Sequence, residues 1–186
     1  LSMARSGTPV LGICGGYQML GQKIIDTGNV ESKYREVEGL GLLDFVTEFV
    51  PEKATTQAKA KVTAGQGLLE GMIGVELEGY EIHMGKTSSN TSVHAFDVIE
   101  TPQGPAGYPD GAINERGTIL GTYLHGIFHN DEFRQGFINN LRRYWGMAAG
   151  AGAVELSRDR EYDKLAELVR RNLDIPAIYQ IMEEME

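Results

Sequence analysis

The pattern of apolar and polar residues along the first part of the chain predicts a buried strand that turns abruptly into a helix. Residues 9–13, Pro-Val-Leu-Gly-Ile, form a short apolar run typical of a strand buried on both faces of a parallel sheet. Residues 1–8, before this run, are expected to hold the end of a helix and a turn. The run itself stops at Cys14, and apolar residues then recur at helical spacing at Tyr17, Leu20 and Ile24. We therefore expect Cys14 between a buried strand and the N-terminus of a helix.

The rest of the chain predicts a strand-rich middle and a helical end. Strands are expected over residues 42–50, 58–62, 75–83 and 93–100, separated by glycines and prolines that include the stretch 102–109. A hairpin is expected from segments 112–114 and 119–123 around Arg116-Gly117. Three helices should follow. The first is capped by Asn130-Asp131 and carries apolar residues from Phe133 to Trp145. The second is marked by Leu165, Leu168 and Val169, and the third begins near Pro176 and carries Ile178, Ile181, Met182 and Met185. This order predicts an α/β fold with an antiparallel excursion in the middle.

Composition and charge exclude several classes of function. With Lys+Arg 17 and Asp+Glu 26, the net charge of 17 − 26 = −9 argues against nucleic acid or an anionic membrane as the main partner. No apolar run approaches the roughly 18 residues of a membrane span, and no leader-like segment opens the chain. The single cysteine excludes an internal disulfide and a Cys-rich metal site, so we expect no metal and a cytoplasmic location.

The segment Gly12-Ile13-Cys14-Gly15-Gly16 has the pattern of a nucleophile elbow with cysteine as the nucleophile. A strand that feeds directly into a helix holds the turn residue in a strained conformation, and small neighbours at Gly12 and Gly16 are expected to prevent a clash across the turn. The helix N-terminus would favour the thiolate, and the N–H of Gly15 would point at the oxyanion. The alternative is that Cys14 is a small buried hydrophobic residue and the glycines only allow close packing.

A cysteine nucleophile needs a base, and the chain has four histidines. His125 follows a predicted strand and leads into a loop, on the side where parallel sheets build their sites. His94 and His129 are interpreted as structural or exposed. His83 lies two residues after Glu81, so both side chains should share one strand face, where they either contact a polar substrate or form a solvated ion pair.

The segment Val10 to Gly21 resembles the elbow of the class I glutamine amidotransferases, which follow the pattern G-x-C-x-G-x-Q. Together with Gly79 to Gly85 and the string Leu124-His-Gly-Ile-Phe128, it is similar to the glutaminase domain of the cobyric acid synthase family. The similarity runs from about Thr8 to the C-terminus. It implies the class I glutamine amidotransferase-like (flavodoxin-like) sheet flanked by helices.

The resemblance also implies an activity and its residues. The expected reaction is hydrolysis of L-glutamine, with ammonia delivered to an N-terminal synthetase domain that uses ATP and Mg to amidate corrinoid carboxylates; no cofactor is expected within this chain. Carried over by position, Cys14 is the nucleophile, His125 the general base and acid, and Gly15 an oxyanion donor.

For substrate binding, the resemblance assigns Gln18 to contact glutamine and places Glu81 and His83 on the strand that lines its pocket.

Two departures from the class I pattern affect these expectations. The usual His-Pro-Glu string is replaced by His125-Gly-Ile127, an absence shared by the cobyric acid synthase family, so a Cys-His dyad is expected and Glu81 is a hypothetical partner that orients His125. The elbow strand begins at residue 9, with no strands expected before it and no Pro-Gly-Ser loop, which in this family supplies a second oxyanion donor. The sequence also contains no phosphate-binding loop of the pattern G-x-x-x-x-G-K-[ST]. Residues 1–186 are therefore expected to be one amidotransferase domain that lacks its first strands and the synthetase domain.

Three alternatives stay open at this point. The same elbow occurs in related cysteine peptidases and chaperone-like hydrolases of this fold. The related cobyrinic acid a,c-diamide synthases share the amidotransferase domain. A catalytically silent domain that only docks to a synthetase is the third.

Overall fold

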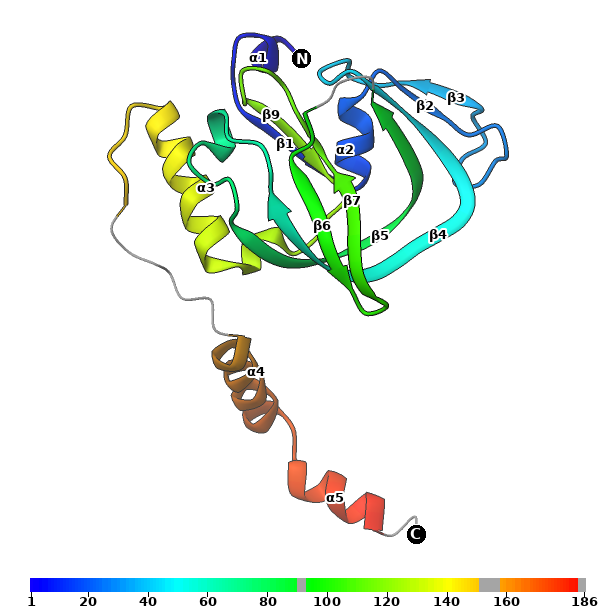
Figure 1. Ribbon diagram of the computed structural model, residues 1–186. Coiled ribbons are helices and arrows are strands. Elements are labelled where there is room, and N and C mark those ends of the chain that lie inside the picture. The colour runs from blue at the N-terminus through cyan, green and yellow to red at the C-terminus, as the bar shows by residue number, and fades with distance from the viewer. Residues whose placement is uncertain (90–92, 151–157, 184–186) are drawn as a thin grey trace. The chain divides into compact units, whose positions relative to one another are not determined.

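The computed structural model describes residues 1–89, 93–150 and 158–183 (Figure 1). The chain divides into two compact units, Leu1–Ala153 and Val154–Glu186. The first unit contains the two sheets and the helices that pack on them, and the described part of the second contains two helices.

A small sheet in the first unit has the strand order β1-β9-β8. Strands β1 (Val10–Ile13) and β9 (Ile119–Thr122) are parallel, with Val10 opposite Ile119 and Ile13 opposite Thr122. β8 (Ala112–Ile113) pairs with β9 in antiparallel fashion, which confirms the predicted hairpin. Because β1 and β9 run in the same direction, Cys14 and the segment 123–125 leave the sheet at the same edge.

A larger sheet forms the middle of the chain, in the strand order β3-β2-β4-β6-β7 with β5 paired to β4. Only β2 and β4 are parallel in it, and every other pairing is antiparallel. The predicted α/β fold with an antiparallel middle is therefore confirmed. The strands are β2 (Lys23–Ile25), β3 (Glu36–Glu38), β4 (Phe45–Val62), β5 (Glu76–Ser89), β6 (Phe96–Thr101) and β7 (Gly104–Asp110).

Several local expectations about this middle region were wrong. The predicted strands 42–50 and 58–62 are parts of one long strand, β4, which begins only at Phe45 and whose pairing with β5 shifts register between Phe49 and Ala54. The stretch 102–109, interpreted as punctuation, forms β7 after the turn at its start. Ile24 is in β2 and not on a helix, because the helix ends at Leu20 and Gly21 adopts an extended conformation (φ −68°, ψ −174°).

The alternation of side chains along β1 and β9 builds two separate cores on the two faces of the small sheet. Leu11, Ile13, Leu120 and Leu124 pack on one face with α3 (Asp131–Tyr144) and strands β4 to β6. Val10, Ile119 and Tyr123 pack on the other with α2 (Gly15–Leu20), as Figure 1 shows by the positions of the two helices. Short helices α1 (Ser2–Arg5), η1 (Gly67–Leu69) and η2 (Ile127–His129) complete the unit.

The first of the three C-terminal helices, α3, begins where it was predicted, but Asn130 does not cap it with its side chain. Its amide group bonds the backbone of β5 instead: the N–H of Glu78 donates to Oδ1 and Nδ2 donates to the Glu78 carbonyl, each at 2.8 Å. Asn130 therefore ties the start of α3 to β5, which also runs past the end of β9.

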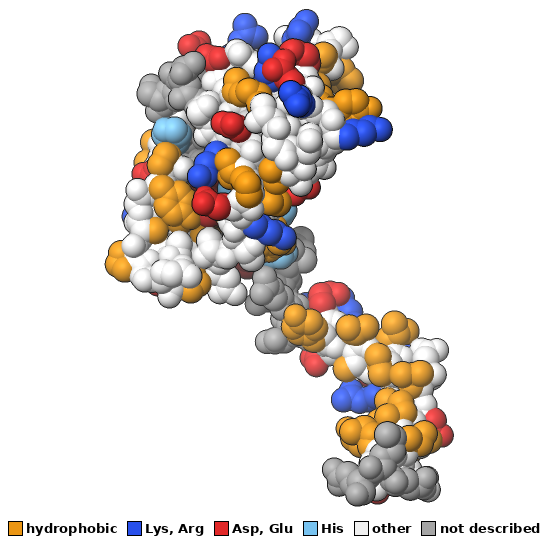
Figure 2. Space-filling model, turned by 90° about the vertical axis from the view of Figure 1, so that its right-hand side faces the viewer, with side chains coloured by type: hydrophobic (Ala, Val, Ile, Leu, Met, Phe, Trp, Pro, Cys, Tyr) orange, Lys and Arg blue, Asp and Glu red, His pale blue; other side chains and the backbone are white. Residues whose placement is uncertain are grey.

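The second unit contains α4 (Arg158–Asn172) and α5 (Ile175–Glu183), as the sequence predicted; Met185 lies outside the described residues. Apolar side chains gather along these helices in Figure 2, and the exposed ones include Leu165, Leu168, Leu173, Ile178, Ile181 and Met182. Within the described parts of the chain, no helix is both long and apolar enough to cross a bilayer.

Candidate functional site

Cys14 lies in a strained turn between β1 and α2. Its backbone has φ 53° and ψ −114°, a conformation that side-chain-bearing residues rarely adopt. The Cys14 N–H donates to the carbonyl of Thr122 at 2.9 Å, and the Cys14 carbonyl accepts the N–H of Gln18 at 3.1 Å. The turn is thus held by β9 on one side and by the first turn of α2 on the other.

The glycines around Cys14 do not contribute equally to this turn. A Cβ on Gly12 would lie 2.6 Å from the Gly16 carbonyl oxygen and 2.7 Å from Leu20 Cδ1, so no side chain fits there. A Cβ on Gly15 or Gly16 would meet nothing within 4 Å. The expectation that small residues are needed on both sides of Cys14 is wrong for Gly16: the close approach is between the Cα of Gly12 and the backbone of Gly16.

His125 follows β9 by three residues and pairs with Tyr80 of β5 through an isolated bridge. The His125 N–H donates to the Tyr80 carbonyl at 2.8 Å, and the Tyr80 N–H donates back at 3.2 Å. The imidazole stacks on the Tyr80 ring, with centroids 4.9 Å apart and planes 9° apart. Nε2 of His125 is a buried side-chain nitrogen without a hydrogen-bond partner in the described part of the chain.

The same segment of β5 also contacts Cys14. The Cys14 thiol lies 3.5 Å from the carbonyl oxygen of Ile82, two residues beyond Tyr80. The structure thus brings Cys14 and His125 to one edge of the small sheet and lays a single strand across both. The segments containing them leave parallel strands that are paired directly to each other.

Glu81 and His83 share the other face of β5, as their spacing predicted. His83 Nε2 lies 3.9 Å from Glu81 Oε1, and His83 Nδ1 donates to the Gly85 carbonyl at 2.9 Å. The hydroxyl of Tyr108 donates to Glu81 Oε2 at 2.6 Å. The partners of Glu81 are therefore Tyr108 and His83, and the hypothesis that Glu81 orients His125 finds no contact among these described residues.

Gln18 belongs to a polar cluster centred on the hydroxyl of Tyr123. Gln18 is buried, and its Nε2 lies 3.5 Å from that hydroxyl. Thr87 of β5 lies 2.6 Å from the same oxygen, and the ring of His83 stacks on the ring of Tyr123 with centroids 3.7 Å apart. Gln18 and His83, both expected near a substrate, are thus joined through one tyrosine.

The surroundings shift the acidity of two groups in this cluster. Burial raises the pKa of the Glu81 carboxyl, but the facing His83 ring and the Tyr108 hydroxyl outweigh it, so the pKa lies below its ordinary value. Burial, and next the bond to Glu81, raise the pKa of Tyr108. Glu81 is consequently an anion held in a buried position, 5% exposed.

Sequence reasoning missed three residues of this region: Tyr108, Asp110 and Tyr123. Tyr108 and Asp110 lie two apart on β7, a strand hidden by its two prolines and two glycines. The alternation of Ala106, Tyr108 and Asp110 is the signal that could have found it. Tyr123 was included in a predicted strand, but no sequence pattern shows that its hydroxyl meets Gln18.

A comparison with known protein families decides what this site belongs to. The sequence profile of the CobB/CobQ-like glutamine amidotransferase domain matches residues 1–133. The chain belongs to this amidotransferase family.

Curated relatives of this amidotransferase domain carry the name cobyric acid synthase. The protein from Dehalococcoides mccartyi (strain ATCC BAA-2266 / KCTC 15142 / 195) is 51% identical over 184 residues, which cover 99% of this chain and 36% of the relative. The protein from Alkaliphilus metalliredigens is 44% identical over 189 residues, covering 98% and 37%. The chain therefore spans little more than a third of the length of these relatives. A solved structure of PurLQS from Thermotoga maritima is similar with a TM-score of 0.48 and 15% identity, covering 77% of this chain and 65% of that one.

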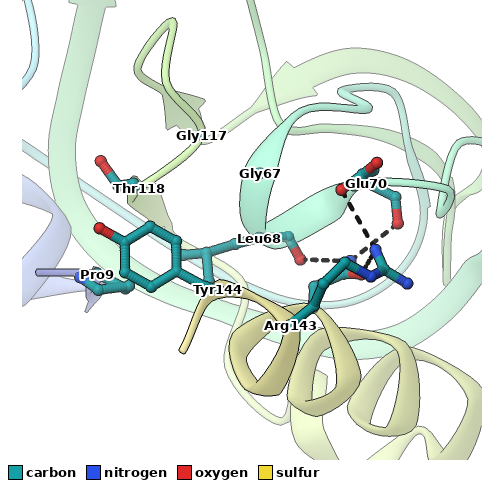
Figure 3. Close-up of a pocket in the computed structure, with 9 residues that line it drawn as sticks. Pro9, Gly67, Leu68, Glu70, Gly117, Thr118, Arg143 and Tyr144 are labelled. Carbon is teal, nitrogen blue, oxygen red and sulfur yellow. Dashed lines mark hydrogen bonds and ion pairs between the residues drawn. The ribbon is translucent and has the colours of Figure 1, made fainter. Parts of the chain in front are cut away.

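The amidotransferase domain also has a pocket of about 200 Å³ that lies away from Cys14, at the opposite ends of β1 and β9 (Figure 3). In it Arg143 of α3 lies 3.2 Å from a carboxylate oxygen of Glu70, and the Tyr144 hydroxyl donates to the Gly7 carbonyl at 2.6 Å. The lining residues are Pro9, Gly67, Leu68, Glu70, Gly117, Thr118, Asn140, Arg143 and Tyr144. None of the site residues predicted from the sequence lines this pocket.

Among the described residues, no group of three or more His, Cys, Asp or Glu side chains could hold a metal ion.

Proposed function

We propose that this chain is the glutaminase part of a cobyric acid synthase, which hydrolyses L-glutamine and supplies ammonia for the amidation of corrinoid carboxylates. The observation that supports it most is the pair formed by a strained cysteine and a buried imidazole nitrogen without a partner among the described residues. Cys14 and His125 follow two strands that are paired in parallel, and β5 contacts both of them. Family membership supplies the glutamine chemistry to which such a pair is suited.

The proposed reaction needs only the thiol, the imidazole and water. The Cys14 sulfur, having given its proton to His125, attacks the side-chain amide carbon of glutamine and forms a tetrahedral oxyanion. His125 returns the proton to the amide nitrogen as the C–N bond breaks, which releases ammonia and leaves a glutamyl thioester. Water then attacks the thioester carbon, His125 takes the proton of the water, and the C–S bond breaks to give glutamate. The proton passes back to the sulfur, so the cycle consumes one glutamine and one water.

The other residues of the site are proposed to bind and stabilise. Gly15 is the first residue of α2, directly after Cys14, and its N–H would donate to the oxyanion. Gln18, Glu81 and His83 would line the glutamine pocket; the buried Glu81 carboxylate suits the α-ammonium group of the substrate.

The partner of this activity would be a synthetase domain of the same enzyme, which would use ATP and Mg to activate the carboxylate. The relatives are nearly three times as long as this chain, which leaves room for such a domain in them. We also propose a cytoplasmic location, because a catalytic thiol must stay reduced.

Covalent trapping tests the proposal on the full 186-residue chain. The glutamine analogue 6-diazo-5-oxo-L-norleucine carries a diazoketone in place of the amide. The diazo carbon takes up a proton, and attack by the thiolate then forms a thioether and expels N₂. We expect intact-mass analysis to show one adduct, on Cys14, and we expect added L-glutamine to slow its formation. Cys14→Ala should abolish the adduct and His125→Asn should slow it at least 100-fold.

The matched control is His94→Asn, which changes a histidine on the loop before β6 and should label like the parent chain. Labelling that ignores glutamine, or a His125→Asn variant that labels at the parent rate, would contradict the proposed function. Failure to label together with reaction towards other electrophiles would favour a cysteine hydrolase of another kind.

A further inference from the structure

Asp110, the last residue of β7, is a buried acid to which the proposed reaction assigns no role. Its side chain is 5% exposed. One carboxylate oxygen accepts a hydrogen bond from the Thr122 hydroxyl, and the other accepts the N–H of Tyr123 at 3.0 Å. Both partners lie at the end of β9, immediately before the segment that carries His125.

The bond to Tyr123 continues the sheet where the backbone can no longer do so. In the β8–β9 hairpin, Ala112 lies opposite Gly121, so Gly111 would lie opposite Thr122 and the next hydrogen-bonded pair would be Asp110 and Tyr123. The chain turns away at Gly111, which has φ 72°, and a Cβ added there would meet the Gly121 carbonyl oxygen. The Asp110 carboxylate therefore takes the place of the missing backbone acceptor.

The bond to Thr122 connects the acid to both proposed reacting residues. The Thr122 carbonyl accepts the N–H of Cys14 at 2.9 Å. The Thr122 hydroxyl oxygen also accepts the N–H of Leu124 at 3.0 Å, one residue before His125. Thr122 is fully buried, so it has no water to replace a lost partner.

We infer that Asp110 is a positioning residue of the proposed glutaminase site, whose carboxylate fixes the end of β9 and thereby sets the placement of His125 relative to Cys14. This inference rests on the proposed function. The contacts of Asp110 are with Thr122 and Tyr123, and it acts on the thiol and the imidazole through them.

The charge state of Asp110 decides whether this network is complete. Burial raises the pKa of the carboxyl to about 6, the nearby Glu81 adds to the rise, and the hydrogen bonds from Thr122, Tyr123 and the Gly111 N–H oppose it. The phenols of Tyr17, Tyr108 and Tyr123 are the other titratable groups that feel its charge, and all three stay neutral because their pKa values are raised. The anion accepts both hydrogen bonds. The neutral acid instead donates its own proton to the Thr122 oxygen, so the hydroxyl proton of Thr122 is left without an acceptor.

The test is the rate of Cys14 labelling by 6-diazo-5-oxo-L-norleucine as a function of pH, in the parent chain and in Asp110→Asn. The asparagine keeps the acceptor for Tyr123 but presents an NH₂ to Thr122, so it imitates the neutral acid. We expect the ratio of the parent rate to the variant rate to be near 1 at pH 5 and to rise about tenfold by pH 7.5. A misplacement of about 1 Å at a reacting group costs about 100-fold, so tenfold corresponds to a smaller shift.

Controls separate this effect from loss of structure. Far-UV circular dichroism and the urea midpoint, which do not depend on the reactivity of the thiol, should show that both chains are folded at each pH. Asp97→Asn changes an exposed acid on β6 and should give a ratio of 1 at every pH. Thr122→Val removes the hydroxyl that bonds both the acid and the N–H of Leu124, so its labelling should be slow at every pH and should no longer follow the charge of Asp110. This loss of pH dependence tests the role of Asp110 if Asp110→Asn does not fold.

A ratio that stays at 1 from pH 5 to 7.5 while the parent labels normally would overturn the role of Asp110 and leave the proposed function standing. A parent chain that never labels would remove the proposed function itself.

Discussion

The backbone N–H of Cys14 is bonded to the carbonyl of Thr122, which extends the parallel pairing of β1 and β9 by one residue beyond β1. The strained turn is therefore built against the segment that carries His125. In a parallel pair the two chains leave the sheet in the same direction, so this backbone bond is enough to bring the two residues to one edge. Backbone geometry thus accounts for the pairing of two residues so distant in the sequence.

The unequal space around the elbow glycines predicts opposite effects of the same substitution. Gly12→Ala places a methyl group 2.6 Å from the Gly16 carbonyl oxygen, so we expect it to lower the free energy of unfolding by about 3 kcal/mol. Gly16→Ala meets no atom and should raise that free energy by up to about 1 kcal/mol, because alanine favours a helix. Urea denaturation of both variants measures the difference, and a destabilised Gly16→Ala would contradict this view of the turn.

The strained backbone of Cys14 predicts that replacing this residue with glycine raises the free energy of unfolding relative to alanine, although it removes the reactive sulfur. Glycine adopts φ 53° without strain, whereas alanine keeps the Cβ and therefore the strain. We expect Cys14→Gly to be about 1 kcal/mol more stable than Cys14→Ala in thermal or urea unfolding. Both variants lack the sulfur and should form no adduct. Equal stability of the two would mean that the turn is relaxed.

Asp110 predicts a specific pH dependence of stability. Its pKa in the folded chain, about 6, is above its ordinary value of 3.8, so the folded state binds this proton more tightly than the unfolded state. The associated stability is fully present below about pH 4 and is lost as the pH rises to about 6, by on the order of 3 kcal/mol. The difference in unfolding free energy between the parent and Asp110→Asn, measured from pH 4 to 7.5, should follow this curve. Asp97→Asn should show a flat difference.

Replacing Glu81 is expected to weaken binding of the substrate analogue and to leave the reactivity of the thiol unchanged. Glu81→Gln removes the charge but keeps the shape, so the half-saturating concentration of 6-diazo-5-oxo-L-norleucine should rise about tenfold while alkylation by iodoacetamide is unchanged. Glu78→Gln alters an exposed carboxylate on the same strand and serves as the control. If the maximal labelling rate falls instead and the half-saturating concentration stays constant, Glu81 acts on the reacting groups and not on the substrate.

The supply of oxyanion donors predicts slow glutamine turnover by the 186-residue chain. Gly15 offers one N–H at the start of α2, and no second oxyanion donor is assigned among the described residues. Loss of one such donor costs about 2.7–4 kcal/mol of transition-state stabilisation, or roughly 10²–10³ in rate. Release of glutamate, compared between this chain and a full-length cobyric acid synthase, measures the deficit. Equal turnover would show that a donor exists within the chain.

The local parts of the site could be predicted from the sequence, and the contacts between them could not. The apolar run before Cys14 and the strand before His125 are continuous patterns, so both residues were located at the correct ends of their strands. β7 was missed because its glycines and prolines resemble a loop, and with it Tyr108 and Asp110 were lost. The roles of Gly12 and Gly16 were indistinguishable because only the fold shows which Cα approaches which backbone.

The parallel pair of β1 and β9 joins the beginning of the first unit to a strand near its end, and all of the larger sheet lies between them in the sequence. Contacts between such distant segments form late, because the chain must first close a long loop. A refolding chain should therefore recover most of its β-structure signal before its sulfur becomes reactive towards a glutamine analogue. The rate at which the adduct appears during refolding would then measure the rate at which the native state forms.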